Sequence, residues 1–186
     1  MRITHSTVLE IESLPTEGPM SIRRRQIREK VLQALYAYEL SHESVDLILD
    51  TIVGTLKKEP EIFEMAKELF LKVIETKDEV DKLITSRVAN WEFGRLAVID
   101  KIILRISICE LLYFDDIPPK VSINEAIEIA RRYSTEKSDK FVNGVLDSVL
   151  DDLKKSGRMR KSGRGLLETS TKKKPIKYFA ERRVCP

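Results

Sequence analysis

Apolar residues recur at intervals of three and four along most of the chain, which is the spacing of an amphipathic α-helix. The clearest case follows Ser138, where aliphatic side chains stand at positions 142, 145, 146, 149, 150 and 153. These positions share one face of a helix, so they predict a buried stripe. No segment alternates convincingly with the period of two that a half-buried strand shows. The pattern therefore predicts an all-α domain.

The same periodicity, combined with residues typical of helix ends, predicts a compact bundle of about seven helices. Ser44 has the position of an N-cap, while Thr76 with Glu79 and Ser122 with Glu125 have the spacing of capping boxes. The predicted helices cover residues 21–41, 44–58, 61–75, 77–89 and 95–114, then a sixth that starts at Ser122 and a seventh from Ser138 to about residue 155.

Charge divides the chain into three parts. The 186 residues carry a net charge of +3, composed of −2 in residues 1–20, −3 in residues 21–155 and +8 in residues 156–186. The two end segments contain proline or glycine and show no sustained period, so we expect them to be disordered. The middle segment is long enough for one domain with its own core. Because this domain is slightly acidic, any contact with nucleic acid must be local.

Cysteine and histidine usage argues against a metal site, a cofactor and an enzyme. Cys109 stands inside an apolar helical pattern, Cys185 is next to the last residue, and His5 and His42 are the only histidines. No metal-ligand spacing results. The sequence also lacks a glycine-rich phosphate loop and a nucleophile elbow. With no signal peptide and no stretch of about 20 apolar residues, a cytoplasmic protein without a membrane span is expected.

Four arginines open the first predicted helix: Arg23, Arg24, Arg25 and Arg28. Like charges at the positive end of a helix macrodipole cost a few tenths of a kcal/mol. Contact with phosphate would offset this cost, and the guanidinium fork suits phosphate. The alternative is a solvated charged face.

Two aromatic residues and two lysines complete a candidate RNA-binding surface. Phe141 lies at the edge of the apolar stripe beside Lys140, and an exposed ring beside a cation can stack on an unpaired base. Tyr36 lies about two turns after the arginines and has the same two interpretations, a stacking ring or a core ring. Lys140 and Lys120 are either contacts or ordinary surface lysines. Gly144, in a helix interior, suggests close approach of another helix.

Several short blocks carry a resemblance to a known family. They are Arg23-Arg24-Arg25 with Gln33-Ala34-Leu35-Tyr36, Asp100 to Arg105 leading to Glu110-Leu111-Leu112-Tyr113, Ile117-Pro118 with Lys120-Val121, Ile123-Asn124-Glu125-Ala126, and Lys140 to Asp147. In this order and spacing, over about residues 21–155, the chain resembles the NusB family of bacterial transcription antitermination factors.

The resemblance implies a fold of two packed helical subdomains, with three helices in the first and four in the second. It also implies binding to boxA, a single-stranded RNA element, together with the ribosomal protein NusE, and association with elongating RNA polymerase, chiefly at ribosomal RNA operons. Asp100, Lys101 and Glu110 on the fifth helix are candidates for the protein-partner interface. A homodimer of the free protein is left open.

The chain departs from the family pattern at Pro119, where an aromatic residue is usual, and at Lys137 and Asp139, where the charges differ from the common acidic-Ser-His-Lys-Phe sequence. Two other functions stay open. The domain could be a helical protein-interaction module without RNA contact, or it could be an accessory domain related to those of RNA methyltransferases. For the basic tail, non-specific RNA affinity and a solubilising role are equally compatible with its charge.

Overall fold

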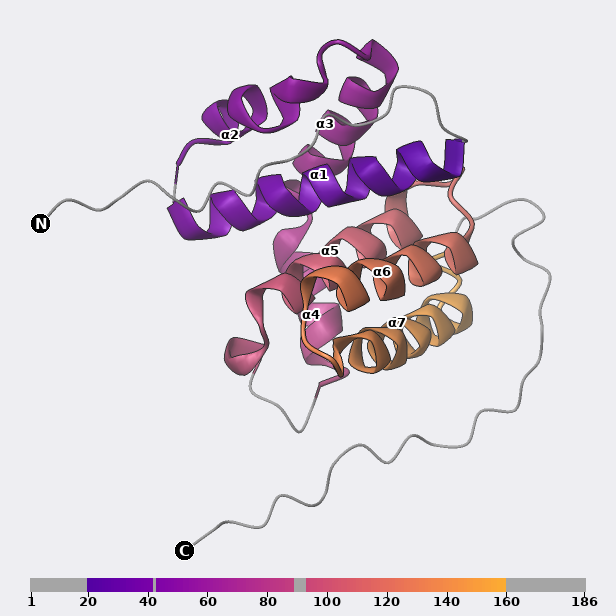
Figure 1. Ribbon diagram of the computed structural model, residues 1–186. Helices are drawn as coiled ribbons and strands as arrows, with labels where there is room; N and C mark the ends of the chain where they lie inside the picture. Colours follow the sequence, from indigo (N-terminus) through magenta and orange to yellow (C-terminus); the bar gives the residue numbers. More distant parts are fainter. Residues whose placement is uncertain (1–19, 42, 89–92, 160–186) are drawn as a thin grey trace, which may run out of the picture.

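The computed structural model describes residues 20–41, 43–88 and 93–159, which form seven α-helices, two 3₁₀-helices and no strand (Figure 1). In chain order these are α1 (Met20–Ser41), α2 (Val45–Thr51), η1 (Val53–Leu56), α3 (Pro60–Glu75), α4 (Lys77–Thr85), η2 (Phe93–Arg95), α5 (Val98–Tyr113), α6 (Pro119–Tyr133) and α7 (Ser138–Lys155). The all-α prediction is confirmed. The expectation of disordered ends concerns residues 1–19 and 160–186, which lie outside the described residues.

α5 is the central helix of the fold. It packs against α1 and α3 on one side and against α4, α6 and α7 on the other (Figure 1). Twelve of its residues are buried, from Asp100 to Leu112. α1, α2, η1 and α3 pack together as the first of the two expected subdomains, and one continuous apolar core joins them to the second. None of the helices in the described ranges combines the length and apolar character that crossing a bilayer requires.

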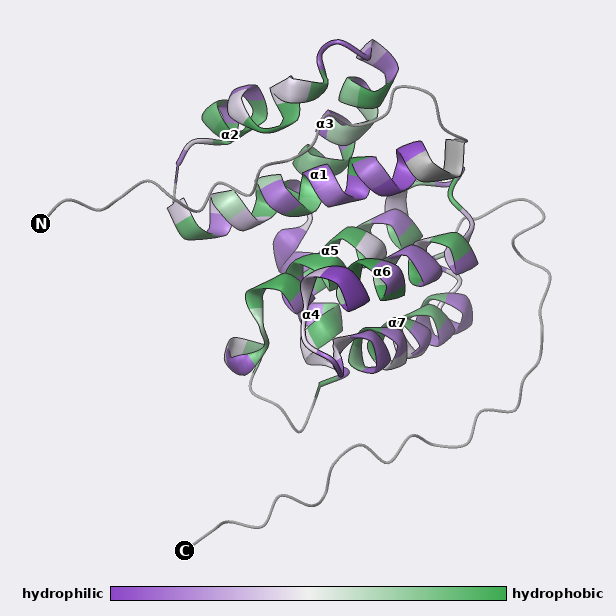
Figure 2. Cartoon of the chain, in the orientation of Figure 1, coloured by the Kyte–Doolittle hydropathy of each residue, from purple (hydrophilic) through white to green (hydrophobic). Residues whose placement is uncertain are grey.

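The apolar stripe of α7 is buried as its spacing predicts. Val142, Val145, Leu146, Val149, Leu150 and Leu153 all belong to the core. Figure 2 shows the resulting division of the helices into green apolar and purple polar sectors. The prediction that this helix starts at Ser138 is also confirmed.

Ser44 caps α2 as predicted, because its hydroxyl accepts a hydrogen bond from the Leu47 amide at 3.2 Å. Both predicted capping boxes are wrong. The Thr76 hydroxyl donates to the Lys72 carbonyl instead of capping α4, at 2.8 Å. α6 begins at Pro119, three residues before Ser122, because proline is preorganised for the first position of a helix.

The interpretation of Gly144 as a site of close helix approach is also wrong. A Cβ atom built on Gly144 meets nothing within 4 Å apart from its own helix. Its cost in the interior of α7 is therefore not offset by packing.

We accordingly predict that Gly144→Ala raises the free energy of unfolding by about 0.5–1 kcal/mol, because alanine loses less backbone entropy than glycine in a helix interior. Urea denaturation monitored by circular dichroism measures this change. Gly157→Ala is the matched control and should destabilise the protein by about 1 kcal/mol, since Gly157 has a φ of 65°. A loss of stability in the Gly144 variant would show that neighbouring atoms leave no room for the added methyl group.

Candidate nucleic-acid interface

The four arginines of α1 do not form one cluster. Arg28 points inward and is 3% exposed, and its Nε and Nη2 donate to the two carboxylate oxygens of Glu110 at 2.8 and 3.2 Å. The third nitrogen, Nη1, donates to the Arg24 carbonyl at 3.2 Å. This burial corrects the expected phosphate contact of Arg28: the side chain is taken up by an ion pair between α1 and α5.

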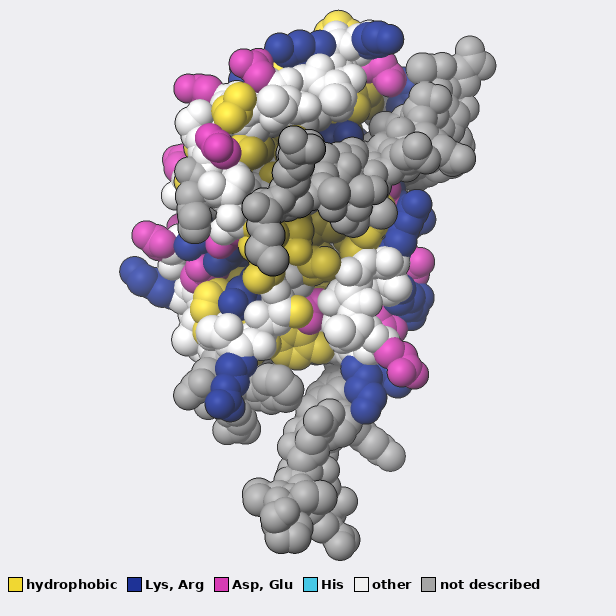
Figure 3. Space-filling model, turned by 60° about the vertical axis from the view of Figure 1, so that its left-hand side comes forward, with side chains coloured by type: hydrophobic (Ala, Val, Ile, Leu, Met, Phe, Trp, Pro, Cys, Tyr) yellow, Lys and Arg dark blue, Asp and Glu magenta, His cyan; other side chains and the backbone are white. Residues whose placement is uncertain are grey.

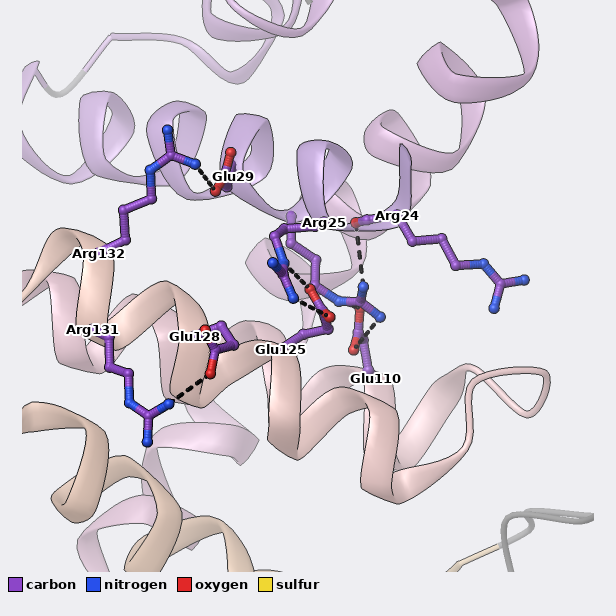
Figure 4. A network of polar contacts seen from close by, with 9 residues as sticks. Arg24, Arg25, Glu29, Glu110, Glu125, Glu128, Arg131 and Arg132 are labelled. Atoms are coloured by element: carbon purple, nitrogen blue, oxygen red, sulfur yellow. Dashed lines mark hydrogen bonds and ion pairs between the residues drawn. The ribbon is translucent and has the colours of Figure 1, made fainter. Parts of the chain in front are cut away.

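Arg25 and Arg24 point in different directions from the same turn. Arg25 donates from Nε and Nη2 to Glu125 of α6 at 2.7 and 2.9 Å, and this hydrogen bonding raises the pKa of its guanidinium. Figure 4 shows the Arg24 side chain directed away from this pair. Its Nη2 lies 3.8 Å from a carboxylate oxygen of Asp116, in the turn between α5 and α6. Arg23 is half-buried.

The end of α6 supplies two cations that the sequence analysis missed. Arg132 donates to Glu29 of α1 at 3.0 Å, and Arg131 donates to Glu128 at 2.7 Å (Figure 4). Arg131 also donates from Nε to Asp139, in the first turn of α7, at 3.1 Å. This contact lowers the pKa of the Asp139 carboxyl. Two adjacent arginines, Arg131 and Arg132, in the last turn of a predicted helix could have indicated these cations from the sequence.

These ion pairs join three helices into one charged face, which we call the α1–α6–α7 face: Arg25, Glu29, Glu125, Glu128, Arg131, Arg132, Asp139 and Lys140. Lys140 is exposed in the first turn of α7. Phe141 follows it and is half-buried, with part of its ring packed against the core. Lys120 is exposed at the opposite end of α6.

Tyr36 extends this face along α1. Eleven residues separate it from Arg25, a spacing that places the two side chains about 20° apart around the helix. Tyr36 is 40% exposed, so its ring is accessible. Leu40, one turn further, is 56% exposed, and Leu47 of α2 is 45% exposed. Figure 3 shows apolar side chains gathered in the middle of one face of the molecule, between clusters of charged ones.

The turn between α6 and α7 is held by Asp100 of α5. Asp100 is 7% exposed, and its carboxylate accepts hydrogen bonds from Ser134 Oγ at 2.6 Å and Ser138 Oγ at 2.9 Å. Because Ser138 is the first residue of α7, the carboxylate also lies at the positive end of that helix. Asp100 thereby fixes the position of Lys140 and Phe141.

Two of the three candidate partner residues are therefore buried. Glu110, 1% exposed, binds Arg28, and Asp100 anchors the α6–α7 turn, so neither carboxylate is presented to another protein in this structure. Their predicted place at the interface is corrected to a structural role. Lys101 is half-buried, and its ammonium lies 5.2 Å from the centre of the Phe93 ring.

The α1–α6–α7 face carries cations, and the exposed ring of Tyr36 and the half-buried ring of Phe141 lie on two of its helices. Cations and aromatic rings are the groups that bind single-stranded RNA, by phosphate contact and by base stacking. The three arginines of this face are already bound to carboxylates. A phosphate that binds these guanidinium groups would have to compete with the carboxylates, so we expect weak RNA binding by this protein alone.

A family model described as "NusB family" matches residues 25–151. Two similar relatives are called "Transcription antitermination protein NusB". The relative from Chloroherpeton thalassium is 48% identical over 84% of this chain and 75% of its own length. That from Salinibacter ruber is 44% identical over 80% of this chain and 93% of its own length.

Solved structures give the same fold. T. maritima NusB superposes with a TM-score of 0.66 at 37% identity and covers 73% of this chain and 93% of its own. A chain from a complex of the antitermination factors NusB and NusE with dsRNA has a TM-score of 0.64 and covers 70% of this chain and 98% of its own. At 24% identity, this second likeness concerns the fold alone.

The buried ion pair predicts a large and specific stability effect. Replacing Arg28 with methionine leaves the Glu110 charge buried without its partner and should cost about 3–5 kcal/mol of unfolding free energy. The double variant Arg28→Met/Glu110→Leu removes both charges and should recover most of that loss.

The matched control is Lys57→Met, which breaks the exposed pair of Lys57 with Asp50. That change should cost less than about 1 kcal/mol. Chemical denaturation of the four proteins measures these differences. Equal losses in the single and double variants at positions 28 and 110 would show that the pair contributes packing rather than charge compensation.

Proposed function

Because this chain belongs to the NusB family, we propose that it is a transcription antitermination factor that binds a boxA-type single-stranded RNA together with the ribosomal protein NusE. In this role it joins elongating RNA polymerase in the cytoplasm, chiefly at ribosomal RNA operons. The observation that supports RNA binding here is the α1–α6–α7 face, where arginines of α1 and α6 are joined by ion pairs and Lys140 is exposed at the start of α7. Tyr36 is exposed along the same side of α1 as Arg25, and the half-buried Phe141 follows Lys140 in the chain.

In the proposed complex, the RNA backbone follows α6. Phosphates contact Arg25, Arg131 and Arg132, with Lys140 at the start of α7, while unpaired bases stack on Tyr36 and Phe141. Lys120 in the first turn of α6, and Arg24 of α1 near the α5–α6 turn, contact phosphates at the other end of the RNA. The role consists of binding and assembly and includes no catalytic step.

A second protein is needed for tight binding because the cations of this face are compensated internally. Glu29, Glu125 and Asp139 each bind one of its arginines. A basic partner placed beside the face would add cations and shield these carboxylates. NusE fills this place in the proposal, and the exposed side chains of Tyr36, Leu40 and Leu47 are candidates for its contact.

That apolar surface also favours a second candidate function. A protein-interaction module without RNA contact would use Leu40 and Leu47 in the same way. It would leave the accessible edge of Phe141 without a ligand. The two functions are separated by whether RNA binding depends on the Phe141 ring.

We predict that Phe141→Leu weakens binding of boxA-type RNA to the complex with NusE by about 5- to 30-fold, because leucine keeps the core packing but cannot stack on a base. Fluorescence anisotropy with a labelled RNA measures the dissociation constant. Phe63→Leu is the matched control, since Phe63 is a half-buried ring on α3, in the other subdomain, and should leave RNA affinity unchanged.

Scrambled RNA of the same length tests specificity in the same titration. Equal affinity for the boxA-type and scrambled sequences, in the presence of NusE, would remove the claim of sequence recognition. If both phenylalanine variants bind RNA as the parent protein does, and NusE alone binds the RNA with the same affinity as the complex, the interaction module without RNA contact becomes the better account.

Competition between carboxylate and phosphate makes a further prediction. Glu125→Gln removes the charge that holds Arg25 and should strengthen RNA binding by about 2- to 5-fold, with a larger effect at low salt. Glu64→Gln makes the same charge change on an exposed residue of α3 and controls for net charge. Equal gains in the two variants would show that Arg25 is not the group that is released.

A further inference from the structure

A groove of about 610 Å³ opens between α1, α3 and the end of α5. Its floor is apolar and includes Ile27, Ile62, Met65 and Leu69. Such a floor favours apolar side chains from a bound segment.

The rim of this groove is acidic. Glu61 and Glu68 stand on α3, and Asp115 and Asp116 stand in the turn after α5. Arg24 also lines the groove, 3.8 Å from Asp116. Among the described residues, none forms an ion pair with Glu61 or Asp115. The rim therefore has an excess of negative charge that suits a cationic segment.

The C-terminal end of the described chain is attached next to this groove. Tyr113 lines the groove and donates its hydroxyl to Glu79 at 2.6 Å. The other carboxylate oxygen of Glu79 accepts a hydrogen bond from Arg158, and Met159 packs against the core. Figure 1 shows the end of α7, the α5–α6 connection and the start of α1 on the same side of the molecule. The described chain thus ends, at Met159, beside the groove.

One stretch of these residues combines the two required properties. Residues 172–179 read Lys-Lys-Lys-Pro-Ile-Lys-Tyr-Phe and contain four cations, three large apolar side chains and no acid. The twelve residues between Met159 and Lys172 can span about 40 Å when extended, more than the roughly 33 Å length of a 22-residue helix such as α1.

We propose that residues 172–179 of this chain bind in the groove, with Ile176, Tyr178 and Phe179 on the apolar floor and Lys172 to Lys174 against the acidic rim. Tethering raises the effective concentration of the segment to the millimolar range, so a weak contact is sufficient. The bound lysines neutralise the carboxylates near Arg24 at the start of α1. The inference rests on the groove and on charge, and it does not require the proposed RNA function.

A nitroxide spin label attached at position 180 tests the proposal in the full chain. The protein is Ala180→Cys/Cys185→Ser, which leaves Cys109 as the only other thiol. Cys109 is 0% exposed, and burial raises its pKa to about 12, so it does not take the label. The expected result is selective paramagnetic broadening of amide signals in Glu61–Leu69 and Tyr113–Asp116. Uniform broadening, broadening of another surface or no broadening would overturn the proposal.

Matched charge reversals test the contacts. Lys172→Glu/Lys173→Glu should abolish the selective broadening, whereas Arg182→Glu/Arg183→Glu makes the same charge change and should preserve it. On the groove, Glu68→Gln should reduce the broadening, and Glu64→Gln, on the same helix but outside the lining, should not. Equal effects of the members of either pair would reduce the contact to non-specific attraction and would overturn the assignment of residues 172–179 to this groove.

Discussion

The bidentate contact of Arg28 with Glu110 fixes the orientation on which the proposed interface depends. The two residues lie 82 positions apart in the sequence, and their side chains are 4% and 1% exposed. A buried ion pair of this kind is weak evidence for stability but a strict constraint on geometry, because neither charge can be left alone in the core. With Arg28 turned toward α5, helical spacing turns Arg25 and Tyr36 toward α6. One inward residue thus determines which side chains of α1 face the proposed RNA-binding surface.

A second buried group fixes the other half of the face. Asp100 holds Ser134 and Ser138, and the start of α7 follows from that contact. Glu110 and Asp100, the two carboxylates that make these contacts, both belong to α5, which is buried along most of its length. The charged face is therefore anchored to a helix whose residues are mostly buried. The arginines of this face are also held by carboxylates, so in the proposed complex they are positioned before RNA arrives but must exchange those partners for phosphates.

The sequence predicts the helices of this protein well because their apolar stripes have the period of 3.6, as the six buried aliphatic positions of α7 show. The sequence is a poor guide to which charged side chains are buried and which residues they contact. Arg28 looks like the surface arginines beside it, and only the position of Glu110 across the fold shows that it is buried. The Thr76 hydroxyl fits a capping box by spacing but bonds backward to Lys72. The predicted interface is thus retained as a proposal at Arg24, Arg25, Tyr36, Lys120, Lys140 and Phe141. Arg131 and Arg132 join it through contacts between helices.

The most direct test of the account is to map the RNA on the protein by amide chemical shifts, with a single-stranded boxA-type RNA added to the isotopically labelled protein in complex with unlabelled NusE. If the α1–α6–α7 face binds RNA, the RNA will shift the signals near Arg25 on α1, near Arg131 and Arg132 on α6, and in the first turn of α7. Shifts confined to α2 and α3, or no shifts at saturating RNA, would contradict the account.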